Sequence, residues 1–119
     1  MAAAADRILD IYNLLKTEKV EVYLPGQHQG EVKTKYVVVT DQGANRFDNF
    51  SSTQCFVELL LYVPKEKYSE LITFANTIKG YMKGLEPMIK PTYNESASFY
   101  DDIVKGHMIS IEYQYYRKI

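Results

Sequence analysis

The spacing of apolar residues predicts two amphipathic helices. In Ala3–Lys16, apolar side chains recur at helical intervals and form one stripe, which consists of Ile8, Ile11, Tyr12 and Leu15. A second helix is predicted over Lys65–Lys83. Pro64 suits its first turn and Gly84 is expected to end it. Its stripe consists of Leu71, Ala75, Ile78 and Met82.

Most of the remaining apolar residues fall in runs that predict β-strands. Val20–Leu24 and Val32–Thr40 are joined by a short connection containing Pro25 and Gly26, which predicts a hairpin. Gln54–Val63 is apolar at nearly every position, which is typical of a central strand covered on both faces. His107–Arg117 alternates between apolar and polar residues, so it predicts a half-buried antiparallel strand. One of its faces carries Ile109, Ile111, Tyr113 and Tyr115.

Two polar segments, Ala44–Thr53 and Asn94–Gly106, are predicted to be long loops. Pro87 and Pro91 exclude a central strand between the second helix and the second loop, so Met88–Tyr93 is expected to be irregular or an edge strand. The chain is therefore predicted to form one α+β domain over residues 1–119, in the order α-β-β-β-α-(β)-β. Its sheet has four to five strands, mostly antiparallel or mixed, with two helices packed on it.

The predicted core lies between the central strand and the second helix. Alternate residues of the strand should face inward, against the apolar stripe of that helix. These inward residues are Cys55, Val57, Leu59, Leu61 and Val63.

Composition excludes several classes of protein. The 119 residues include 14 Lys plus Arg and 15 Asp plus Glu, a net charge of -1, which disfavours both a strongly basic nucleic-acid binder and an acidic disordered tail. Cys55 is the single cysteine, so no internal disulfide or cysteine zinc cluster is expected. No run of 18 apolar residues predicts a membrane span, and the short apolar start does not resemble a signal peptide. A cytoplasmic globular domain is the expectation.

Catalytic, cofactor-binding and metal-binding motifs are not found. Neither helix follows a glycine-rich phosphate loop. His107 could meet Asp101 and Asp102 at a metal site, but the three lack ligand spacing, and a histidine at a strand start beside solvated acids is favoured. The central strand also lacks the basic and aromatic pattern of an RNA-recognition sheet. We therefore expect no enzyme activity and no cofactor.

Aromatic residues supply the candidate protein–protein contacts. The chain has 11 Tyr, 5 Phe and no Trp, and tyrosine suits surfaces that are buried in one state and wet in another. Both predicted loops carry aromatic side chains within polar sequence. Two explanations stay open: these residues anchor the loops to the core, or they form contacts on assembly. The candidates are Phe47, Phe50, Phe99, Tyr100, Tyr113 and Tyr115.

Several features together resemble a family of phage proteins. A central strand ends in Val63-Pro64, Lys65–Tyr68 opens a helix that ends at Gly84, and a tyrosine-rich strand closes the chain. This arrangement is similar to small tail-completion proteins of long-tailed bacteriophages and prophages, which include tail terminators and head–tail joining or minor capsid proteins. The near-neutral charge departs from the acidic lumen expected of a ring around DNA.

The resemblance implies a structural subunit without enzyme activity or cofactor. Such subunits form a homo-oligomeric ring, a hexamer on the tail, at the head-proximal end of the tail tube. The ring stops tube growth and provides the surface on which the head docks. The implied partners are further copies of the chain, the tail-tube protein and head-completion proteins, with no sequence-specific nucleic acid and no membrane. The implied location is the virion tail, and the host cytoplasm during assembly. A small bacterial binding domain or an unrecognised enzyme is the alternative.

Overall fold

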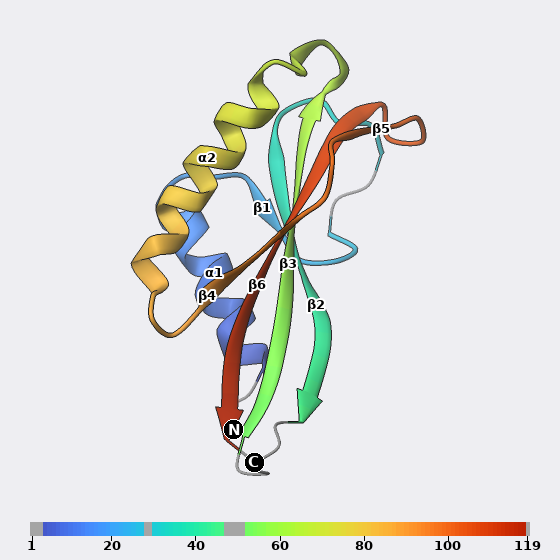
Figure 1. Cartoon of the computed structure of the whole chain (residues 1–119). Helices are drawn as coiled ribbons and strands as arrows, with labels where there is room; N and C mark the ends of the chain where they lie inside the picture. The colour runs from blue at the N-terminus through green and yellow to red at the C-terminus, as the bar shows by residue number, and fades with distance from the viewer. Residues whose placement is uncertain (1–3, 28–29, 47–51, 119) are drawn as a thin grey trace.

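The computed structural model is a long, twisted mixed sheet with two helices packed against it (Figure 1). It describes residues 4–27, 30–46 and 52–118. In these residues the sheet order is β1-β2-β3-β6-β4, and β5 also pairs with β6. The predicted α+β class, with helices packed on a sheet, is confirmed. The elements are α1 (Ala4–Thr17), β1 (Val22–Tyr23), β2 (Tyr36–Arg46), β3 (Ser52–Pro64), η1 (Lys65–Lys67), α2 (Glu70–Met82), η2 (Lys83–Leu85), β4 (Lys90–Glu95), β5 (Phe99–Asp101) and β6 (Gly106–Lys118).

Both predicted helices form, and the second is shorter than expected. In α1, Ile11 and Leu15 are fully buried, and Ile8 and Tyr12 pack against the same core. The segment after Pro64 begins with the 3₁₀ turn η1, and the α-helix starts only at Glu70. The 3₁₀ turn η2 follows α2, so Gly84 lies in this tighter turn instead of capping an α-helix. Such 3₁₀ turns are common at helix ends.

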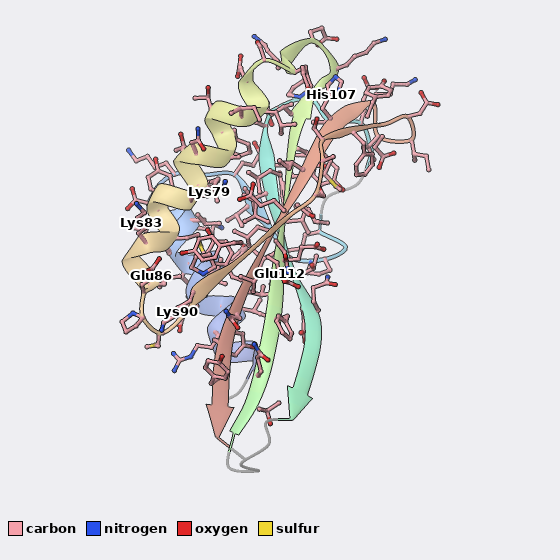
Figure 2. The ribbon with its side chains drawn as sticks, in the orientation of Figure 1. Lys79, Lys83, Glu86, Lys90, His107 and Glu112 are labelled. Carbon is pink, nitrogen blue, oxygen red and sulfur yellow. The ribbon has the colours of Figure 1, made fainter. Side chains whose placement is uncertain are left out.

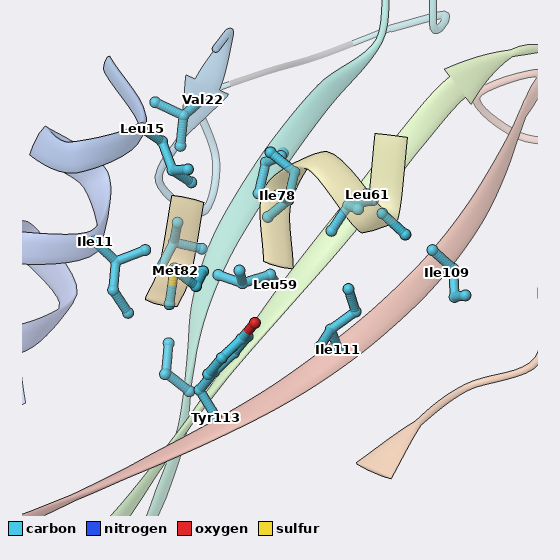
Figure 3. Packing of buried hydrophobic residues seen from close by; sticks show 14 of the residues in the cluster. Ile11, Leu15, Val22, Leu59, Leu61, Ile78, Met82, Ile109, Ile111 and Tyr113 are labelled. Carbon is cyan, nitrogen blue, oxygen red and sulfur yellow. The ribbon is translucent and has the colours of Figure 1, made fainter. Parts of the chain in front are cut away.

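The core lies between one face of the sheet and the two helices. Leu59, on β3, is paired with Val39 of β2 on one side and with Ile111 of β6 on the other. Figure 3 shows Leu59 among the side chains of α1, α2 and β6. The predicted inward face of β3 is confirmed, because all five residues are at most 1% exposed and the α2 stripe opposite is also buried.

The predicted hairpin is wrong, because β1 pairs parallel to β2. Parallel neighbours need a connection that returns to the start of the second strand. Val32 in this connection is 3% exposed, and its N–H donates to the Val104 carbonyl, 2.7 Å away. A Cβ on Gly106 would lie 2.6 Å from Val32 Cγ2, so the glycine permits this close contact. The connection therefore reaches from the β2 edge across to the β5–β6 turn (Figure 1).

The prediction that both faces of β3 are covered also differs from the structure. Both helices pack on the face that carries Leu59, and the opposite face is only half-buried at Phe56, Leu60 and Tyr62. We call this second surface the open face of the sheet. The sequence of β3 is apolar at nearly every position because alternate residues point into the core and the residues between them lie on the open face, which is itself largely apolar.

Both predicted loops contain strand. β2 continues past Thr40, the predicted end of the strand, to Arg46, through a bulge between Asp41 and Ala44 where Gly43 has a φ of 94°. The glycine tolerates this conformation, so the strand bends instead of ending. The second predicted loop contains the end of β4 and all of β5. β4 lies at the sheet edge, as expected for the segment with Pro91.

Candidate protein–protein interface

The structure separates the six aromatic candidates into three groups. Phe99 and Tyr100 lie on β5 and are 49% and 38% exposed. Tyr113 and Tyr115 on β6 are 3% and 2% exposed, so they belong to the core and offer no surface in the monomer. β6 is central, between β3 and the β4 and β5 edge, and this position explains their burial. Phe47 and Phe50 lie outside the described residues.

Three more exposed apolar side chains lie on neighbouring segments, and we call the five together the β5 end. Besides Phe99 and Tyr100 it includes Tyr68 after η1, Ile72 of α2 and Ile103 in the β5–β6 turn. These three are also exposed, Ile103 by 90%. A group of large exposed apolar side chains on neighbouring segments is a candidate for protein–protein contact.

An aromatic cluster gives the β5 end a fixed shape. His107, at the start of β6, lies between two tyrosine rings: its ring centroid is 4.7 Å from that of Tyr68 and 5.1 Å from that of Tyr100. The Tyr68 hydroxyl is 3.1 Å from Ser98 Oγ. These contacts join the turn before α2 to β5 and β6. Figure 2 shows His107 at this end of the sheet. The histidine is therefore a packing residue.

The histidine is not part of a metal site in this structure. In the described residues no group of three or more His, Cys, Asp or Glu side chains is placed to hold a metal ion. Asp101 Oδ1 instead accepts a hydrogen bond from the Ile103 N–H, at 3.0 Å, within the turn. Cys55 is a buried free thiol in the core.

The neighbouring strand β4 is held by side chains as much as by backbone pairing. Its pairing with β6 is interrupted between Pro91 and Glu95, where Tyr93 has a φ of 68°. Lys79 of α2 forms a 2.6 Å salt bridge with Glu95. Thr92 and Asn94 donate hydrogen bonds to Glu112 Oε1 on β6, at 2.8 and 3.0 Å. Pro91 lacks a backbone donor, and the bulge twists the strand, so this part of the edge is protected from pairing.

Three tyrosines form a ladder at the upper part of the open face. The Tyr36 ring stacks on Tyr62 at 4.9 Å and meets Tyr23 edge-on at 5.3 Å. Tyr23 donates a hydrogen bond to Glu21. Burial raises the pKa of Tyr36 and of Tyr62, and the nearby Asp101 carboxylate raises both further. This ladder could not be predicted from the sequence, because only the strand register brings the three rings together.

A groove beside α2 has a volume of about 590 Å³. It lies between α2 and the connection from α1 to β1. Lys35 Nζ lies 5.4 Å from the ring centroid of Phe74 at its wall. The remaining lining residues are Glu18, Lys19, Val20, Glu21, Thr34, Ser69, Glu70, Thr73, Thr77 and Tyr81. Charges of both signs and hydroxyl groups are interspersed there, without a nucleophile–base pair.

Comparison of the sequence with known protein families and with curated proteins gave no match. In the described part of the chain, neither helix combines the length and hydrophobicity needed to cross a bilayer.

Proposed function

We propose that this chain is a structural subunit of a phage or prophage tail: a ring-forming tail terminator or head–tail joining protein that caps the tail tube and connects it to the head. The observation that carries the proposal is the β5 end, where five large apolar side chains lie exposed around an edge strand. A lone domain gains little from exposing them, whereas an assembly buries them against a neighbour.

The architecture is consistent with this role. A sheet with free edges and helices on one face can extend from subunit to subunit. In a head-to-tail ring, each subunit uses two different surfaces, one of which we assign to the β5 end. Phe47 and Phe50, outside the described residues, stay candidates for the same or the opposing surface.

Genetic complementation tests this role. Deleting the gene from the phage or lysogen should give tails that fail to join heads. The wild-type gene should restore joined particles, and a Phe99→Ser, Ile103→Ser variant should not, because it loses two exposed apolar contacts. Tyr93→Ser is the matched control: Tyr93 is 84% exposed but lies on β4, outside the β5 end.

The melting temperatures of the variants separate assembly from folding. All three proteins should melt within a few degrees of one another, because the changed side chains are exposed in the monomer. Normal tails in the deletion strain, or full complementation by the double variant, would contradict the proposal.

The groove beside α2 is the observation that favours the alternative, a small bacterial binding domain. In that case complementation would depend on groove residues and not on the β5 end. Lys35→Ala, which removes the cation beside Phe74, distinguishes the two, because a tail subunit should tolerate it.

A further inference from the structure

We infer that subunits join when the β5–β6 turn of one copy inserts Ile103 into an apolar pocket that follows α2 in the next copy. This inference rests on the proposed function, because it specifies the second of the two surfaces that a head-to-tail ring needs. Three observations carry it: the turn presents a fixed apolar tip, the pocket lies on the other side of the molecule, and the two surfaces carry opposite charges.

The β5–β6 turn presents Ile103 on a rigid support. The side chain is 90% exposed. Its backbone N–H donates to Asp101 Oδ1 at 3.0 Å. The carbonyl of the next residue, Val104, accepts a hydrogen bond from the Val32 N–H at 2.7 Å. Because the turn is already held on both sides of its tip, insertion into a partner costs little ordering entropy.

The receiving surface is a pocket of about 310 Å³ at the end of α2, which we call the η2 pocket. Its walls are formed by residues 84–89 and by Asp10 of α1. Met88 in this wall is 53% exposed, and Leu85 is half-buried against the core. A methionine adapts its shape to fill gaps around a neighbouring side chain. The pocket is therefore suited to an apolar anchor such as Ile103.

The turn and the η2 pocket lie on opposite sides of the molecule. In Figure 1 the β5–β6 turn is at the upper right, and the chain that follows α2 is at the left. Figure 2 likewise places Lys83 and Glu86 on the opposite side from His107, which lies at the β5 end. One copy therefore cannot fill its own pocket. Insertion into a different surface of the next copy is a heterologous contact, the kind that builds rings.

Charge complementarity identifies the occupant of the pocket as a second copy. In the turn, Asp102 and Lys105 flank Ile103, and both are exposed. At the pocket, Lys83 begins η2 and Glu86 follows it, so the two lie three residues apart on one side of this turn. In the described residues none of these four charged side chains forms a salt bridge.

Insertion of Ile103 therefore allows two ion pairs between copies, Lys105 with Glu86 and Asp102 with Lys83. Exposed ion pairs add little affinity, but they determine the orientation of a contact and disfavour partners with like charges. The apolar tip supplies the buried area, and the four charges determine how the turn enters the pocket.

Two other hollows of the described surface fit the turn less well. In the groove beside α2, Phe74 is only 5% exposed, and charges of both signs are mixed with hydroxyl groups. In a smaller hollow between α2 and β4, Lys79 is already bridged to Glu95 at 2.6 Å. The η2 pocket instead combines an exposed apolar wall with a carboxylate, that of Glu86, outside any salt bridge in the described residues.

Charge reversal tests this contact. Lys105→Glu leaves a carboxylate on both surfaces of a copy, and Glu86→Lys leaves an ammonium group on both. Each variant alone should need about tenfold higher concentration than the wild type to form rings, because like charges meet at every contact. An equimolar mixture should form rings at the wild-type concentration, with the two variants alternating. Native mass spectrometry, with one variant isotopically labelled, should count equal numbers of both.

Lys16→Glu is the matched control, because it makes the same change of charge on α1, outside both surfaces. It should assemble like the wild type. All variants should melt within a few degrees of one another, since the changed side chains are exposed. If one of the first two folds poorly, Asp102→Lys and Lys83→Glu form a second pair, which should also assemble only when mixed.

The outcomes separate this contact from the proposed function. Unchanged ring formation by each single variant, or a mixture that stays disassembled, would overturn the inference, while rings of the wild type would still support the proposed function. Normal head joining in the deletion strain, with rings of the wild type intact, would refute the proposed function and leave the contact in place. A wild type that is monomeric at every concentration would overturn both.

Discussion

Truncation of Leu59 measures how much the fold depends on the covered face of the sheet. The side chain is 0% exposed and lies on the central strand between Val39 and Ile111, both of which are buried. Leu→Ala in such a core removes buried apolar surface and leaves a cavity, at a cost of 2–5 kcal/mol in comparable proteins, and we expect about 3–4 kcal/mol here. For a domain of this size, this lowers the melting temperature by roughly 10–20 °C.

Leu60→Ala is the matched control, because the next residue of β3 carries the same side chain on the open face. Leu60 is only half-buried, so the substitution should cost about 1 kcal/mol, the transfer free energy of a smaller area. Urea denaturation at low protein concentration, followed by circular dichroism, gives both values free of assembly effects. Equal losses for Leu59 and Leu60, or a larger loss for Leu60, would refute the assignment of the two faces.

Three further predictions concern packing, pH and metals. Gly106→Ala should destabilise the fold by about 1–3 kcal/mol in a thermal melt, because the new Cβ would lie 2.9 Å from the Val63 carbonyl oxygen. The control Gly80→Ala in α2 should be neutral or stabilising, because a Cβ there meets no atom within 4 Å. Burial, with Glu95 and Glu86 nearby, raises the pKa of Tyr113 to about 12. The free energy of unfolding should therefore fall between pH 10 and 12, where this tyrosine ionises in the unfolded chain but not in the folded one. The fall should be shallower in Tyr113→Phe, and an unchanged dependence on pH would contradict this. Treatment with a chelator should leave the melting temperature unchanged, since the described residues contain no metal-binding cluster, and a fall of many degrees would reveal a metal the account lacks.

Local patterns in the sequence predicted the elements and the core well. The apolar stripes of both helices, the alternation on β6 and the inward face of β3 depend on spacing along the chain, and each lies where it was expected. Pro91 likewise predicted that its segment lies at the edge of the sheet, because a proline lacks the backbone N–H that a central strand needs, and β4 is indeed an edge strand.

Features that depend on distant contacts were not predictable from the sequence. β1 runs parallel to β2, and the connection between the two strands is held by distant contacts of Val32 with Val104 and Gly106. β5 consists of only three residues, Phe99–Asp101, which is too short for the alternation of apolar and polar residues that identifies a strand. A periodicity argument also cannot tell a strand covered on both faces from one with an open apolar face, as at Leu60.

Tyr113 and Tyr115 illustrate the same limit at the candidate interface. Their alternation with polar residues identified a shared face but not what covers it. The two helices cover that face, so both rings are in the core. Phe99 and Tyr100 are exposed because they lie on the short edge strand that the sequence pattern did not reveal.

Native mass spectrometry of the purified chain over a series of rising concentrations tests the central claim most directly. If the chain is a ring subunit, we expect one closed species of about six times the chain mass of 13.8 kDa, with no larger assembly, because a heterologous contact that closes on itself ends growth. A monomer at every concentration, or a continuous series of sizes without a preferred end point, would contradict the account of this chain as a ring subunit.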